Sequence, residues 1–228
     1  MDAYPTHPPM CLPYAAAPVM STTSTGASHT RFPWMKRISD MVNKLFDSYS
    51  PLDVPVVHRA TLYGCALIGG TAVQFLARQY GVKERRSRSI NDLDFITPAS
   101  NPLTRHFNDW LVRSHFREIK AGASEYMWNY ENPHAGVEVD VLISHDPLLP
   151  SQIIKVAQIL VWHPVNLFVS KVQRMTTFNT RADTDKADLN TLYDILEQRN
   201  ELPLLEAALS HLDLSDAEIA QVNEWIKE

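Results

Sequence analysis

The sequence predicts an α/β (α+β) protein: a mixed sheet flanked by helices, followed by a mainly helical C-terminal half. Three observations lead to this prediction. Residues 63–68 are a short apolar run that ends in two glycines and precedes a segment with helical spacing. Residues 136–143 alternate apolar and polar side chains, as a half-buried strand does. Beyond Pro150, apolar residues recur at the three- and four-residue intervals of helices.

The first 32 residues are predicted to be a disordered Pro/Ser/Thr-rich tail. Residues 1–30 contain five prolines, one Asp and no Lys or Arg, so they bring little apolar surface to offset the entropy of ordering. Prolines interrupt the mildly apolar stretch of residues 10–20, and no positive charge precedes it, which disfavours a signal peptide. We therefore expect a cytoplasmic protein.

The rest of the chain divides into an α/β domain over residues 33–150 and a helical region over residues 151–228. Apolar spacing, glycines and prolines set the expected bounds of each element. Pro51 and Pro55 should end the first helix, and Gly81 should end the second. The expected order is a helix from residue 33, a strand at 63–68, a helix at 71–80, a strand at 92–97, a helix at 102–115, strands at 116–120, 125–130 and 136–143, and helices near 164–178, 185–199, 203–211 and 215–227.

Composition excludes several protein classes. With 45% hydrophobic residues, the 228-residue chain can build a core, yet it has no run of about 18 apolar residues that could span a membrane. Two cysteines exclude a disulfide scaffold and a cysteine-based zinc finger. The nine histidines show no metal-ligand spacing, and a P-loop motif is absent.

Charge is unevenly distributed. Residues 197–228 hold eight acidic and two basic side chains, whereas the remainder of the chain is close to neutral. A basic loop follows the second helix: together with Arg78, near the end of that helix, it comprises Lys83, Arg85, Arg86 and Arg88. Arginines can bind phosphate in bidentate fashion, so the loop could contact a nucleotide or an RNA backbone, or be a solvated surface segment.

Asp92 and Asp94 are the first candidate chemical residues. In a strand, residues two apart point to the same face, about 7 Å apart along the chain. Two carboxylates on one face repel each other unless a cation lies between them, and hard divalent cations prefer oxygen ligands. An isolated Asp-x-Asp is common in solvated loops, so this motif needs support from elsewhere.

Two further elements supply that support. Gly69, Gly70 and Thr71 join a strand to a helix, where backbone N–H groups can approach a phosphate, or where Thr71 could simply cap the helix. In residues 137–141 three valines share one face and Glu138 and Asp140 share the other. If this strand lies beside the Asp-x-Asp strand, Asp140 adds a third carboxylate; otherwise it belongs to the polar face of an edge strand.

The order of these parts resembles that of the nucleotidyltransferase superfamily. Residues 66–97, with Gly-Gly-Thr-Ala, an Arg at position 88 and Asp-Leu-Asp, look like the AbiEii/AbiGii-type toxins, which include the MenT nucleotidyltransferases. Lys171 and the Asp185-Lys-Ala-Asp188-Leu189 segment are candidates for two further family motifs. Gly70 stands where the wider superfamily has Ser, so a hydroxyl contact to phosphate would come from Thr71.

The resemblance implies a nucleotidyltransferase-like fold, with residues 33–150 as the catalytic domain. It implies Mg²⁺ (or Mn²⁺) held by Asp92, Asp94 and Asp140, with Lys171 as a further catalytic residue. Nucleotide binding would involve Gly69, Gly70, Thr71, Arg88, Lys171 and Asp188. The implied partners are a nucleoside triphosphate, the 3′ end of tRNA and an antitoxin protein, with no membrane.

The residues leave other functions open. A nucleotidyltransferase fold that has lost catalysis could serve as a nucleotide- or RNA-binding module. An enzyme that modifies a protein or a small molecule, such as an antibiotic, would carry the same motifs, because none of them encodes the acceptor pocket.

Overall fold

The structure, a computed structural model, describes residues 53–85, 92–119, 126–178 and 182–227. The predicted N-terminal tail and the helix expected from Pro33 lie outside these residues. The described elements are α2 (Asp53–Leu62), β1 (Ala66–Ile68), α3 (Gly69–Tyr80), β2 (Asp92–Pro98), α4 (Thr104–Arg113), β3 (Arg117–Glu118), β4 (Met127–Asn132), β5 (Val137–Ser144), η1 (Pro150–Gln152), β6 (Ile153–Val156), β7 (Ile159–Trp162), α5 (Pro164–Phe178), α6 (Ala182–Gln198), α7 (Leu202–Ser210) and α8 (Asp216–Lys227).

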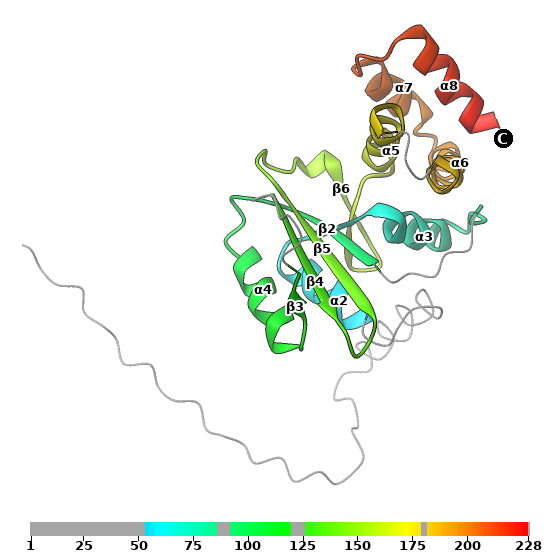
Figure 1. The fold of residues 1–228 in the computed structure, drawn as a ribbon. Helices are drawn as coiled ribbons and strands as arrows, with labels where there is room; N and C mark the ends of the chain where they lie inside the picture. Colours follow the sequence, from blue (N-terminus) through cyan, green and yellow to red (C-terminus); the bar gives the residue numbers. More distant parts are fainter. Residues whose placement is uncertain (1–52, 86–91, 120–125, 179–181, 228) are drawn as a thin grey trace, which may run out of the picture.

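The strands form one mixed sheet of seven, in the order β3-β4-β5-β2-β1-β7-β6. The pairs β2–β5 and β1–β7 are parallel, and the other neighbours are antiparallel. Helices cover the sheet, and the C-terminal helices α5 to α8 gather at one end of the molecule (Figure 1). The predicted class, a mixed sheet flanked by helices with a helical C-terminal part, is confirmed.

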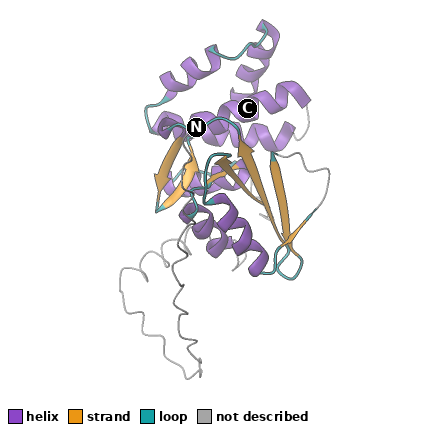
Figure 2. Ribbon diagram, turned by 90° about the vertical axis from the view of Figure 1, so that its left-hand side faces the viewer, coloured by secondary structure: helices purple, strands orange, loops and turns teal. Residues whose placement is uncertain are grey.

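The two faces of the sheet have different environments. Phe95 points to the face covered by α4, where its ring meets Phe107 edge-on at 5.8 Å between centroids. Because side chains alternate along a strand, Asp94 points to the opposite face. Figure 2 shows helices on both sides of the strands. The sheet therefore keeps an apolar core under α4 and turns its carboxylates towards the C-terminal helices.

Most expected elements occur, with shifted ends. Strand 63–68 shortens to β1, and the helix expected from Thr71 begins two residues earlier, at Gly69. Gly81 ends α3 in the left-handed conformation, with φ 68°, as its position after the helix predicted. The predicted run 116–120 is reduced, within the described residues, to the two-residue strand β3.

Two elements were not expected. Helix α2 begins at Asp53, so Pro55 lies in its first turn rather than ending a helix. Residues 153–162 form the β6–β7 hairpin, although the sequence pattern predicts helices beyond Pro150. The hairpin extends the sheet past β1, whereas the division into two domains stays a prediction.

Candidate active site

Asp94 and Asp140 lie side by side in the sheet. They occupy paired positions of the parallel strands β2 and β5. On the far side of β5, Asn129 pairs with Asp140 and donates a hydrogen bond from Nδ2 to its Oδ1, at 2.7 Å. The conditional prediction that Asp140 joins the Asp-x-Asp strand is therefore confirmed. Asn129 fixes the orientation of the Asp140 carboxylate and was not identified from the sequence.

The same row continues across β1 to β7. Ile68 pairs with Asp94 in the antiparallel β1–β2 ladder. Leu67 pairs with Val161 in the parallel β1–β7 ladder, so the next residues, Ile68 and Trp162, are neighbours as well. One row thus runs across five strands and places, in spatial order, Trp162, Ile68, Asp94, Asp140 and Asn129.

Asp92 lies one step away from this row. It pairs with Glu138, two residues before the Asp94–Asp140 pair, on the same face of the sheet. Among the residues that the structure describes, no group of three His, Cys, Asp or Glu side chains is placed to hold a metal ion. The structure brings together two of the three predicted metal ligands, and Asp92 stands beside them.

Gly69 makes room for the Asp94 carboxylate. Its φ is +69°, and a Cβ atom built on it would lie 1.9 Å from Asp94 Oδ2. Only glycine accommodates both the backbone conformation and the close approach. The start of α3 is thereby held against the carboxylate, which explains why a glycine is needed at this turn.

Thr71 ties the helix to the Asp-x-Asp strand. Its side chain is buried, and its hydroxyl donates a hydrogen bond to the carbonyl oxygen of Asp92 at 2.9 Å. Gly70, next to it, is also buried. The hydroxyl group that was expected to reach a phosphate is used inside the protein, so binding of a phosphate at this turn would rely on backbone N–H groups.

The electrostatics of the site centre on Asp94. Burial, together with the charges of Asp92 and Asp140, raises the pKa of Asp94 from its ordinary value of 3.8 to about 7. The positive charges of Lys171 and Arg174 act in the opposite direction, although they do not compensate. A carboxylate in this position gains from a nearby cation, which is the environment of a ligand for a divalent metal.

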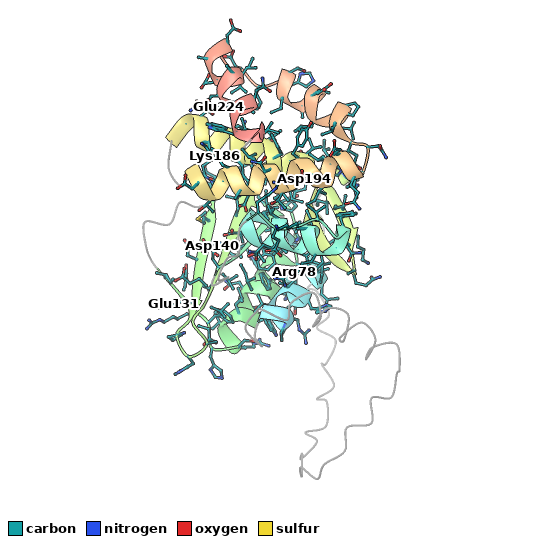
Figure 3. All side chains as sticks on the ribbon, turned by 90° about the vertical axis from the view of Figure 1, so that its right-hand side faces the viewer. Arg78, Glu131, Asp140, Lys186, Asp194 and Glu224 are labelled. Carbon is teal, nitrogen blue, oxygen red and sulfur yellow. The ribbon has the colours of Figure 1, made fainter. Side chains whose placement is uncertain are left out.

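A cavity of about 270 Å³ opens above the row. Figure 3 shows Asp140 on the part of the sheet nearer to the C-terminal helices, with Glu131 towards the opposite end. Two walls of the cavity belong to different parts of the fold. The sheet and its β1–α3 turn contribute Ile68, Gly69, Asp94, Phe95, Met127, Asp140, Leu142 and Trp162, and α5 contributes Ser170 and Arg174.

Lys171, which was predicted to contact the nucleotide, lies in a buried ion cluster. It is 3% exposed, and its Nζ lies 3.1 Å from Asp185 Oδ1 and 2.6 Å from Asp188 Oδ2. Arg174 joins the cluster through Asp185, with Nε 2.9 Å from Oδ2 and a second, very short contact from Nη2. The structure does bring Lys171, Asp185 and Asp188 together, but as a buried ion cluster that joins α5 to α6.

Two of the residues grouped with the basic loop form ion pairs within the protein. Arg78, on α3, pairs with Glu84 at 2.9 Å, and Arg85 reaches Asp194 on α6 at 3.0 Å. Lys83 is exposed. The remaining predicted members, Arg86 and Arg88, lie outside the described residues.

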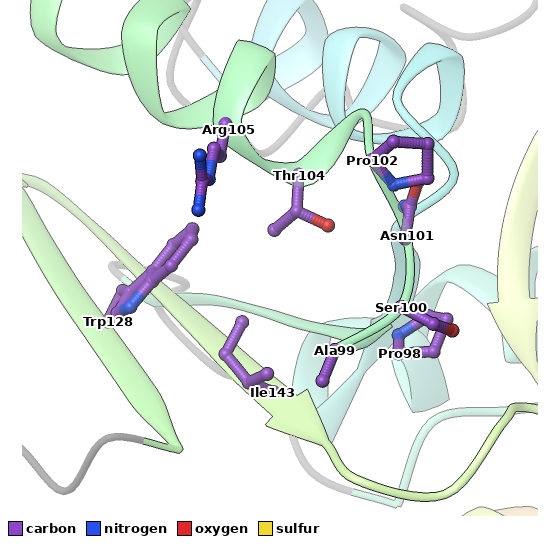
Figure 4. Close-up of a pocket in the computed structure, with 9 residues that line it drawn as sticks. All are labelled: Pro98, Ala99, Ser100, Asn101, Pro102, Thr104, Arg105, Trp128 and Ile143. Atoms are coloured by element: carbon purple, nitrogen blue, oxygen red, sulfur yellow. The ribbon is translucent and has the colours of Figure 1, made fainter. Parts of the chain in front are cut away.

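A second hollow, of about 440 Å³, lies at the end of β2 and β5, on the face covered by α4 (Figure 4). Arg105 of α4 points towards Trp128 of β4 across it. Asn101, in its wall, is held by contacts within the protein, because its Nδ2 donates to the Tyr63 carbonyl and to Thr97 Oγ1. This hollow is separated from the carboxylates by the sheet.

No helix among the described residues is long and apolar enough to cross a membrane. No family model and no curated protein matches the sequence. Among solved structures, it is similar to the polyadenylate synthase of Megavirus, with a TM-score of 0.44 and 15% identity over 79% of this chain and 39% of that chain. It is also similar to JHP933 of Helicobacter pylori, with a TM-score of 0.40 and 16% identity over 84% of this chain and 93% of that one.

This chain therefore spans about two fifths of the length of the viral protein.

Proposed function

We propose that this protein is a metal-dependent nucleotidyltransferase that moves a nucleoside monophosphate from a nucleoside triphosphate to an acceptor hydroxyl. One observation carries the proposal. Asp94 and Asp140 are paired on parallel strands in the wall of a cavity, directly beside the Gly69 turn at the start of a helix. Carboxylates next to a helix N-terminus suit a metal-bound polyphosphate, because each recognises one part of it.

In the proposed reaction, the acceptor oxygen forms a bond to the α-phosphorus as the bond from that phosphorus to the bridging oxygen breaks. Pyrophosphate leaves with the electron pair of the broken bond. Asp140, oriented by Asn129, accepts the proton of the acceptor hydroxyl, directly or through water. Burial, and then the charges of Asp92 and Asp140, raise the pKa of Asp94, and a metal ion beside this carboxylate would favour its ionised form.

Mg²⁺ or Mn²⁺ would neutralise the negative charge that develops on the phosphates. Asp94 and Asp140 would be its principal ligands, with Asp92 as the third. The residues proposed for the nucleotide are the backbone of Gly69, Gly70 and Thr71, together with Arg88. Lys171 and Asp188, predicted to touch the nucleotide, would act from the buried cluster behind the cavity.

The acceptor is proposed to be RNA, with the 3′ end of tRNA as the specific target. This rests on the resemblance of residues 66–97 to the MenT-like toxins and on the basic residues around α3. A toxin of this kind would have an antitoxin protein as a partner. RNA held through phosphate contacts would be released steeply as the salt concentration rises.

The test is incubation with each labelled nucleoside triphosphate, Mg²⁺ or Mn²⁺, and a mixture of total tRNA and total protein. We expect label on RNA, abolished by Asp94→Asn and by Asp140→Asn. Asp194→Asn is the matched control, because this aspartate lies on α6 and pairs with Arg85. Label on protein would move the acceptor to a protein hydroxyl. Nucleotide binding that needs no divalent metal and transfers no label would identify an inactive binding module instead.

A further inference from the structure

Trp162 carries a buried hydrogen-bond donor without an acceptor. Of the buried side-chain nitrogen and oxygen atoms in the described residues, only its indole Nε1 lacks a hydrogen-bond partner. An unpaired buried donor is costly, and such groups in native proteins call for an explanation. Trp162 also lines the cavity that holds Asp94 and Asp140. A ligand in this cavity with an acceptor oxygen would complete the hydrogen bonding of the indole.

Arg174 brings a second donor to the same cavity. Within the described residues its contacts use Nε and Nη2, both directed at Asp185, so Nη1 is available to a ligand. Asp185 is completely buried and also accepts a hydrogen bond from Lys171. The guanidinium group is therefore held in a fixed orientation, with its side chain 39% exposed. Arginine held this way suits phosphate oxygens, which it can meet with a planar edge.

The cavity is lined by hydrogen-bond donors as well as by carboxylates. Trp162, at one end of the cross-strand row, and Arg174, on α5, offer hydrogen-bond donors, and the Gly69 turn adds the start of α3. Asp94 and Asp140 offer acceptors only. A ligand that satisfies both kinds of group must be an anion that carries a divalent cation, which describes a metal-bound polyphosphate.

We propose that Trp162 and Arg174 form the binding site for the leaving pyrophosphate, with Asp185 as the residue that positions Arg174. This inference rests on the proposed function and names the part of the substrate that these residues hold. In this arrangement Lys171 does not contact the pyrophosphate, because its ammonium group forms ion pairs with Asp185 and Asp188. The phosphate contact on α5 falls to Arg174, one helical turn further on.

The experiment is calorimetric titration of the full chain with inorganic pyrophosphate in the presence of Mg²⁺. We expect binding to weaken about tenfold or more in Arg174→Gln and about tenfold in Trp162→Phe, the loss typical of one hydrogen bond to a charged group. Arg117→Gln is the control, because Arg117 is also an arginine in an ion pair, with Glu131, at the far edge of the sheet. The affinity of Arg117→Gln for pyrophosphate should equal that of the wild type.

The outcomes separate this inference from the proposed function. Unchanged pyrophosphate affinity in both variants, or no binding by the wild type, would overturn the inference even if nucleotide transfer is observed. Weakened binding in both variants supports it even if the wild type transfers no nucleotide. If Arg174→Gln does not fold, judged by circular dichroism, Trp162→Phe decides alone. For Asp185→Asn, we expect weaker pyrophosphate binding and a higher KM for the triphosphate without loss of the folded state.

Discussion

At the scale of single residues, Gly69 is the position where backbone and site chemistry meet. Replacing it by Ala puts a methyl group 1.9 Å from Asp94 Oδ2 and forces a non-glycine residue to φ +69°. We expect Gly69→Ala to destabilise the fold by about 2–4 kcal/mol, from backbone strain and overpacking together, and to abolish transfer. Chemical denaturation and the labelling assay check both effects.

Gly81→Ala is the matched control for that substitution. Gly81 has nearly the same φ, +68°, but a Cβ there would meet no atom within 4 Å. We expect Gly81→Ala to lower the free energy of unfolding through backbone strain alone, by about 1–2 kcal/mol, and to retain nucleotide transfer. Equal losses of stability in the two variants would contradict the close approach of Asp94.

The raised pKa of Asp94 predicts a pH-dependent effect on stability. The folded chain keeps a proton on Asp94 up to about pH 7, whereas the unfolded chain releases it near pH 3.8. Stability in the absence of metal therefore falls as the pH rises between these values. Asp94→Asn removes this penalty, so its stabilising effect should be larger at pH 8 than at pH 5 by about 2–3 kcal/mol. Urea titrations of the metal-free protein at the two pH values measure this, and an equal effect at both would contradict it.

Residue patterns predicted some members of the site but not others. Asp94, Asp140 and Gly69 belong to short local motifs, in which strand alternation and a strand-to-helix turn fix the direction of the side chain or backbone. Trp162 and Arg174 carry no such pattern. The place of Trp162 in the site depends on the pairing of β7 with β1, and that of Arg174 depends on the way α5 lies over the sheet. Both are tertiary features that spacing along the chain does not encode.

At the scale of elements, the Lys171 cluster fastens α5 to α6. Lys171→Met would remove the buried ammonium group that Asp185 and Asp188 share, while Asp185 would keep its contact with Arg174. Breaking a buried ion pair by removing one partner is strongly destabilising. We expect a loss of about 3–5 kcal/mol in the free energy of unfolding. Arg85→Gln, which removes an exposed ion pair with Asp194, should cost less than about 1 kcal/mol.

Equilibrium denaturation of both variants distinguishes the two kinds of ion pair. Combining Lys171→Met with Asp188→Asn should recover part of the lost free energy of unfolding, because the buried carboxylate that paired with Lys171 is then neutral. A Lys171→Met protein as stable as Arg85→Gln would mean that the buried cluster contributes nothing to the fold.

The two unexpected elements have physical explanations. The β6–β7 hairpin turns at Ala157 and Gln158, with φ 46° and 67°. Positive φ at two successive positions normally selects Asn or Gly, so the sequence lacks the usual mark of a tight hairpin. In α2, Pro55 lies where the helix has no need of its N–H group, and therefore does not act as a helix breaker. Tertiary packing overrides the local preference of the residues in the hairpin turn, whereas Pro55 occupies a position that suits proline.

At the scale of the whole molecule, β7 pairs with β1 and so protects the middle of the sheet. A chain that ends at residue 150 would lack β6 and β7 and leave β1 with an open edge. Open apolar edges promote aggregation. We expect this truncated protein to be recovered mainly in inclusion bodies, whereas a chain that begins at residue 51 and keeps all seven strands stays in solution. Size-exclusion chromatography of the two proteins tests this, and a monodisperse truncated protein would contradict it.

The parallel pairing of β1 with β7 also governs when the cavity comes into existence. β1 leaves the ribosome almost a hundred residues before its parallel neighbour β7. During that interval the nascent chain holds the acidic positions of the row but neither Trp162 nor helix α5. Pairing over such a sequence separation is slow, since the closure entropy of a long loop precedes any gain from contacts. The cavity therefore gains both of its walls only after most of the polypeptide has been synthesised, and a ribosome-bound fragment that ends before α5 lacks the cavity.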